Sequence, residues 1–117
     1  MYSPELLDHF EHPRNSGELA GASVRVRVEN PACGDLLELA AKVVDDRIEQ
    51  IRFRAKGCVP AMACASAMTE LVKGRSIEEA RAITREDVAS AVGGLPPASG
   101  HAAQLAIDSL RAALARL

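Results

Sequence analysis

The sequence has 117 residues, with 14 basic and 16 acidic side chains and a formal net charge of −2. This balance provides no broad cationic surface, which argues against general binding to a nucleic-acid backbone. Aromatic residues make up only 3% of the chain, too few for the stacking surfaces that bind single strands. The length and the 48% of apolar residues predict a single domain over residues 1–117.

The cysteines favour a reducing compartment. Cys33, Cys58 and Cys64 are too few, and odd in number, for a disulfide-stapled secreted scaffold. Residues 1–15 lack the basic and apolar regions of a secretory signal, and the longest apolar stretch, residues 59–68, is about half of what spans a bilayer. We therefore expect a cytoplasmic protein with reduced thiols, and neither nucleic acid nor a membrane as its partner.

The first half of the chain predicts a short helix and a sheet. An amphipathic helix is expected over residues 3–10, ending before His12-Pro13. Three stretches with alternating polarity follow, over residues 23–29, 36–44 and 48–56. Asp45-Asp46 suits a hairpin turn between the last two. The pattern predicts a small antiparallel sheet with one solvent-exposed face.

Helical periodicity follows Gly57. The predicted helices span residues 60–73, a short segment from Ser76, residues 84 to about 92, and the segment from about residue 100 to the end. The Ser76 helix is indicated by the capping-box pattern Ser-Ile-Glu-Glu. Strands followed by helices indicate an α+β fold, a three-stranded antiparallel sheet with helices packed on one face.

Most candidate ligands lie at the boundaries of these elements. Cys33 and Asp35 belong to the turn between the first two strands, Cys58 follows the third strand, and His101 opens the last helix. Loops at strand ends and helix starts converge on one rim of a sheet. Thiolate, carboxylate and imidazole are common ligands of zinc and iron. Spacing alone leaves two interpretations open, a metal site or cysteines that are small buried apolar residues.

Several motifs, taken in order, carry a resemblance to a known family. They are Asn-Pro-Ala-Cys-Gly-Asp at 30–35, Lys-Gly-Cys at 56–58, Leu-Pro-Pro at 95–97 before His101, and the opening segment from Tyr2 to Asn15. Together they resemble the iron–sulfur cluster assembly scaffold IscU and the N-terminal domain of NifU, over nearly the whole chain. The resemblance implies an IscU/NifU-N-like α+β domain that acts as a carrier and not as an enzyme.

The same resemblance implies the cargo, the ligands and the partners. A [2Fe–2S] cluster, or iron, would be held by Cys33, Asp35, Cys58 and His101, and the isolated protein could hold Zn²⁺ there. Sulfur would come from a cysteine desulfurase, and the cluster would pass to apo iron–sulfur acceptor proteins. Two other interpretations stay open, a sulfur carrier that takes persulfide on Cys33 or Cys58, and a divergent zinc-binding paralogue that assembles no cluster.

The sequence departs from the family pattern after His101 and after Pro97. Ala102 stands where the family has its third ligand cysteine, which is also the usual persulfide-forming residue. Ala98-Ser99 replaces a Val-Lys pair, and the lost lysine puts docking of an Hsp70-type chaperone in doubt. Cys64 could compensate for Ala102, but residues six apart on a helix do not share a face, which favours a packing role for Cys64.

Two further groups of residues have ordinary interpretations. His9 and His12 are expected to be surface or capping histidines. Basic residues alternate along the predicted strands, at Arg25, Arg27, Arg52, Arg54 and Lys56. They are interleaved with glutamates and predict a solvated sheet face, with a docking surface for an acidic partner as the alternative.

Overall fold

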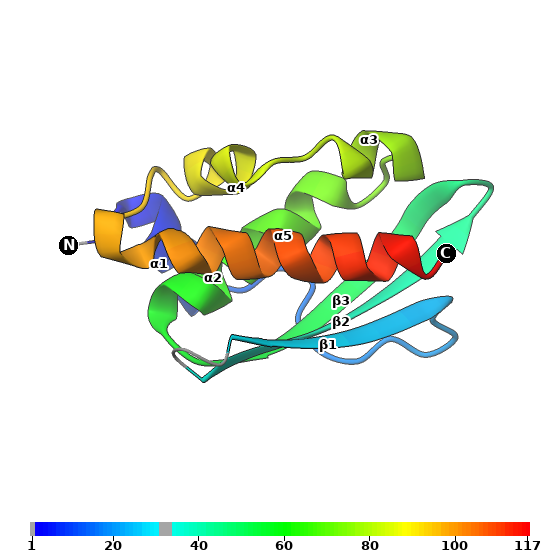
Figure 1. Cartoon of the computed structure of the whole chain (residues 1–117), viewed down its shortest axis with the longest axis horizontal. Coiled ribbons are helices and arrows are strands. Elements are labelled where there is room, and N and C mark those ends of the chain that lie inside the picture. Colours follow the sequence, from blue (N-terminus) through cyan, green and yellow to red (C-terminus); the bar gives the residue numbers. More distant parts are fainter. Residues whose placement is uncertain (1, 31–33) are drawn as a thin grey trace.

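The computed structural model describes residues 2–30 and 34–117 and shows a three-stranded sheet with helices on one side (Figure 1). The strands are β1 (Val24–Asn30), β2 (Asp35–Val44) and β3 (Arg47–Lys56), all antiparallel, in the order β1-β2-β3. The predicted α+β class and its antiparallel sheet are confirmed.

Alternating polarity explains which face of the sheet is buried. Val26, Leu39 and Phe53 are paired across the three strands, and all are buried beneath the helices. One position along, Arg27, Glu38 and Arg54 form an exposed row. The two residues of the turn at 45–46 both have positive φ, 51° and 65°, as a two-residue hairpin requires. The hairpin prediction is therefore confirmed.

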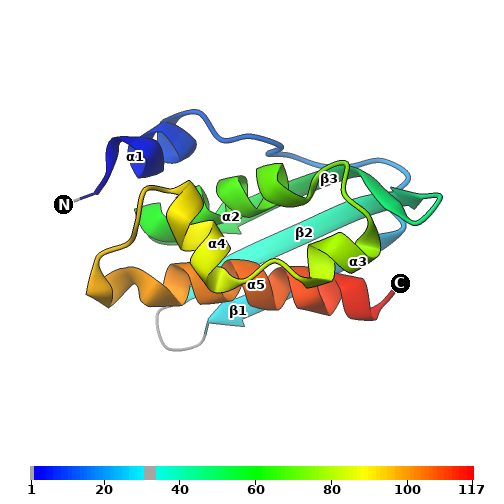
Figure 2. The ribbon, with the colours of Figure 1, turned by 90° about the horizontal axis from the view of Figure 1, so that it is seen from above.

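The helices are spread over one face of the sheet, as the view from above shows (Figure 2). In chain order they are α1 (Pro4–Glu11), α2 (Val59–Val72), α3 (Ile77–Arg81), α4 (Arg85–Ala91) and α5 (Gly100–Ala115), with a 3₁₀ turn at Pro97–Ser99. Helices α2 and α5 pack on the strands, and the shorter helices pack against those two. Of the helices that the structure describes, none is long and apolar enough to cross a membrane.

Helix α2 occupies the centre of the core. Its alanines, including Ala63, Ala65 and Ala67, are almost completely buried, as is Met68. A helix that is apolar on all sides has to be enclosed by other elements. Alanine side chains let the sheet, α1 and α5 approach this helix closely.

Helix α1 is anchored to α2 by a buried polar contact. His9 is 6% exposed, and its Nδ1 lies 2.8 Å from Oγ of Ser66, which also accepts the backbone N–H of Arg14 at 2.9 Å. Burial lowers the pKa of His9 below its usual value. The expected surface role is therefore wrong for His9, because the face that carries Leu6 and His9 turns toward α2. His12 is exposed and caps the C-terminus of α1.

Candidate metal centre

Three of the four candidate ligands meet at one end of the sheet. Asp35 begins β2, Cys58 precedes α2, and His101 is the second residue of α5. Because β2 begins opposite the end of β3, with Leu36 paired to Lys56, Asp35 lies beside the start of α2. Figure 1 shows the start of α5 at that same end.

The ligand atoms of these three residues form a compact triangle. Sγ of Cys58 lies 3.4 Å from Oδ2 of Asp35 and 3.7 Å from Nε2 of His101. Oδ2 of Asp35 lies 3.6 Å from that same Nε2. Among the residues described, this is the group of histidine, cysteine and acidic side chains whose ligand atoms are close enough to share a metal ion.

The triangle has the dimensions of a tetrahedral coordination face. Zinc bound about 2.3 Å from sulfur and about 2.0–2.1 Å from nitrogen and oxygen puts neighbouring ligand atoms about 3.3–3.6 Å apart. The three separations of 3.4, 3.6 and 3.7 Å are near those values. One thiol, one carboxylate and one imidazole therefore fit a single zinc or iron ion without large movement.

The burial of the three side chains differs. The Asp35 side chain is only 4% exposed, whereas that of His101 is 35% exposed and Cys58 is partly buried. Oδ1 of Asp35 accepts the backbone N–H of Cys58 at 3.1 Å, which compensates for part of its desolvation. The site therefore has a buried carboxylate at its base and two more accessible ligands at its rim.

Of the other two cysteines, one lies outside the described residues and the other is buried. Cys33 lies outside the described residues, so its predicted place in the site stays a prediction. Cys64 is completely buried, and burial raises the pKa of its thiol to about 12, with the charge of Cys58 as a smaller cause. It is not part of the triangle. This burial supports the packing interpretation of Cys64. Ala102 is also completely buried.

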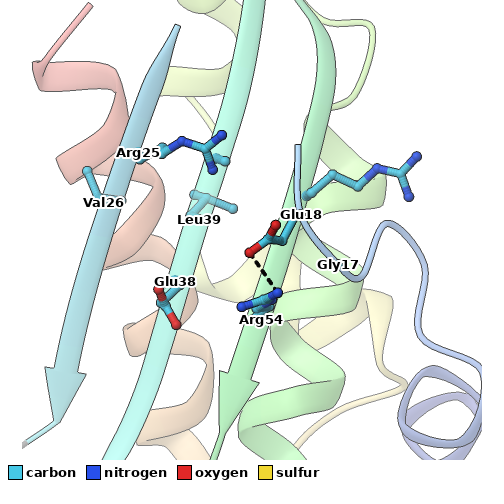
Figure 3. A pocket seen from close by; sticks show the side chains of 9 residues that line it. Gly17, Glu18, Arg25, Val26, Glu38, Leu39 and Arg54 are labelled. Atoms are coloured by element: carbon cyan, nitrogen blue, oxygen red, sulfur yellow. Dashed lines mark ion pairs between the residues drawn. The ribbon is translucent and has the colours of Figure 1, made fainter. Parts of the chain in front are cut away.

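A hollow of about 70 Å³ on the exposed face of the sheet is a second candidate for a binding site (Figure 3). It lies over the small Ala40, between Arg25 and Arg52, which are paired with it in the sheet. The guanidinium groups of both arginines donate to backbone carbonyls. Arg54, also at the hollow, forms an ion pair with Glu18 at 2.7 Å. Because these cations already have partners within the chain, the hollow supports the interpretation of a solvated face.

Comparison with known proteins gives a consistent family. The family model of the NifU-like N terminal domain matches residues 1–117. The chain is 49% identical over 114 residues to "Iron-sulfur cluster assembly scaffold protein IscU 1" of Archaeoglobus fulgidus, covering 97% of this chain and 74% of that protein. It is 43% identical over 118 residues to "Iron-sulfur cluster assembly scaffold protein IscU" of Escherichia coli, covering 97% of this chain and 91% of that protein.

Solved structures agree with the fold. A putative iron–sulfur cluster assembly scaffold protein for the SUF system, from Fervidobacterium islandicum, superposes with a TM-score of 0.81 at 21% identity, covering 97% of this chain and 96% of that one. The N-terminal part of a NifU-like protein from Brucella abortus gives 0.79 at 19% identity, covering 97% and 92%. At these identities the likeness concerns the fold alone.

Proposed function

Because the chain belongs to the family of NifU-like N-terminal domains, we propose that it is an iron–sulfur cluster assembly scaffold. In this role it is a carrier, which receives iron and sulfur, holds them as a cluster and passes the cluster to acceptor proteins. The observation that supports this role most directly is the triangle of Asp35, Cys58 and His101, whose separations suit one metal ion.

The proposed ligands are Cys33, Asp35, Cys58 and His101. Thiolates are the ordinary ligands of a sulfide-bridged cluster, and carboxylate or imidazole groups in their place bind the cluster iron less strongly. A set that mixes these groups suits cargo that has to leave again. We further propose that the cargo is a [2Fe–2S] cluster, and that zinc occupies the same ligands in protein isolated without iron.

The proposed partners follow from the role. A cysteine desulfurase would supply sulfur at the rim, where Cys58 and His101 are partly exposed. Apo iron–sulfur proteins would receive the cluster at the same rim. Docking of an Hsp70-type chaperone stays in doubt, because the 95–99 segment carries no basic residue and Ser99, where the family pattern has lysine, is 8% exposed.

Metal analysis after anaerobic reconstitution tests this function. With iron and sulfide we expect one dinuclear cluster per chain and its visible absorption. The double variant Cys33→Ser/Cys58→Ser should lose both, because hydroxyl groups replace the two thiolates. The matched control Cys64→Ser makes the same substitution at a buried position outside the triangle and should retain the cluster.

Two results would contradict the scaffold function. The first is an unchanged metal content in the double variant, which would place the metal elsewhere. The second is a parent protein that accepts persulfide on Cys33 or Cys58, detected by mass spectrometry, and never develops cluster absorption. The second result would favour a sulfur carrier.

A further inference from the structure

The glycine before Cys58 has a backbone conformation that other residues rarely adopt, and Asp35 occupies the space that a side chain there would need. Gly57 lies between the end of β3 and the start of α2, with φ of +154°. A Cβ at this position would lie 2.7 Å from Cγ and 3.1 Å from Cβ of Asp35, and closer still to Oδ1. The present position of the Asp35 carboxylate therefore excludes any side chain at residue 57.

The Asp35 carboxylate accepts the backbone N–H of the N-cap residue of α2, whereas in α3 and α4 an acidic residue of the same helix accepts it. In α3, the side chain of Glu79 accepts the backbone N–H of the N-cap residue Ser76 at 2.9 Å. In α4, Asp87 does the same for Thr84, also at 2.9 Å. These acids occupy the third helical position, the usual place in a capping box.

Helix α2 has no acid at that position, where the residue is Ala61. The N–H of its N-cap residue, Cys58, is bound instead by Oδ1 of Asp35 at 3.1 Å, from another strand. The Cys58 side chain makes no capping hydrogen bond. The thiol of Cys58 is thus directed to the triangle, and Asp35 makes the hydrogen bond to the N-cap residue that an acid within the helix would otherwise make.

The two oxygens of Asp35 consequently have different partners. Oδ1 is held by the backbone of Cys58, and Oδ2 faces Sγ of Cys58 and Nε2 of His101. We propose that Gly57 is a positioning residue for the site. Its missing side chain allows Asp35 to bind the Cys58 N–H, and this contact fixes Oδ2 as a one-oxygen ligand at the corner of the triangle.

The inference rests on the proposed function in that it assigns the triangle to metal binding. Groups that orient metal ligands through hydrogen bonds typically change metal affinity about 10–100-fold when they are lost. A methyl group at residue 57 would displace Asp35 and break the contact with Cys58 N–H. We therefore expect the dissociation constant for one divalent ion to rise about 10–100-fold in Gly57→Ala.

Titration with Co²⁺ under anaerobic conditions measures this, because thiolate-to-cobalt absorption reports ligation by the cysteines of the site. The matched control is Gly74→Ala, at the other end of α2. Gly74 also has positive φ, +83°, but a Cβ there meets nothing within 4 Å. Both substitutions strain the backbone, so a merely conformational effect would appear in both. We expect Gly74→Ala to change the dissociation constant less than about twofold.

A double-mutant cycle with Asp35→Ala separates positioning from general damage. Once the carboxylate is removed, Gly57→Ala should change Co²⁺ affinity less than about twofold further. An equal loss from Gly57→Ala with and without Asp35 would overturn the inference, as would an unchanged affinity in Gly57→Ala alone.

Thermal unfolding keeps the test decisive without metal. If Gly57→Ala folds poorly, adding Asp35→Ala should restore part of its melting temperature, because the clash is with that side chain. A double variant that melts no higher than Gly57→Ala would refute the positioning role. If the parent protein binds no Co²⁺, no Fe²⁺ and no cluster, the proposed function fails, while this melting comparison still decides the role of Gly57.

Discussion

Replacing Ser66 by alanine should loosen α1 from the rest of the fold. Ser66 is completely buried, and its Oγ bonds Nδ1 of His9 and the backbone N–H of Arg14. The buried hydrogen bond to His9 contributes about 1 kcal/mol net, and the N–H of Arg14, left without its partner, costs about 1–3 kcal/mol. Together these effects predict a loss of about 2–4 kcal/mol in the free energy of unfolding.

Urea unfolding followed by circular dichroism measures this loss, with Ser109→Ala as the matched control. Ser109 is equally buried, but its hydroxyl donates to the carbonyl of Leu105 within the same helix, at 2.9 Å. Its removal leaves no donor unpaired, and alanine is the better helix former. We expect a change within about 1 kcal/mol for that variant.

Hydrogen exchange locates the effect. In Ser66→Ala the amides of residues 4–11 should exchange faster, while those of β2 keep the protection of the parent protein. The reasoning is refuted if the two serine variants lose equal stability, or if Ser66→Ala loses less than about 0.5 kcal/mol.

The remaining predictions concern His9, Cys64 and Ala102. Burial keeps the pKa of His9 low in the folded chain, so the unfolded chain takes up the proton first; stability should be full above about pH 6.5 and should decline as the pH falls below it. Urea unfolding at pH 7.5 and 5.5 should show a smaller decline in His9→Gln, and the full decline in the control His12→Gln. With a pKa of about 12, about one Cys64 thiol in ten thousand is ionised at pH 8, so a disulfide reagent should label it after unfolding and hardly at all before. Ala102→Cys should lengthen the lifetime of the cluster followed by absorbance, and a lifetime that shortens only in Cys64→Ser would instead identify Cys64 as a ligand.

Much of the fold could be predicted because its signals are local. Alternating polarity identified the three strands, and the Ser76 capping box identified the start of α3, since each depends on neighbours within a few residues. The burial of His9 could not be predicted in this way. It depends on α2, 57 residues along the chain, and helical periodicity does not say which element covers a given face.

The candidate site could likewise be predicted only in part. Element boundaries indicated that Asp35, Cys58 and His101 would lie on one rim, and the structure brings these three together. Their role as metal ligands stays a prediction. The hydrogen bond from the N–H of Cys58 to Asp35 could not be predicted, because it joins the N-cap of α2 to the start of β2, 23 residues away in the chain. An alanine at the third position of α2 was the available signal of a missing cap.

The three rim residues come from segments that are distant along the chain, at positions 35, 58 and 101. An ion held by all three would cross-link the start of the sheet, the central helix and the last helix. Such an ion binds the folded chain and not the unfolded one, so at a hundred times its dissociation constant it adds about 2.7 kcal/mol to folding stability. The melting temperature would then report how much of the protein is loaded, and each release of cargo would leave behind a chain that unfolds more easily.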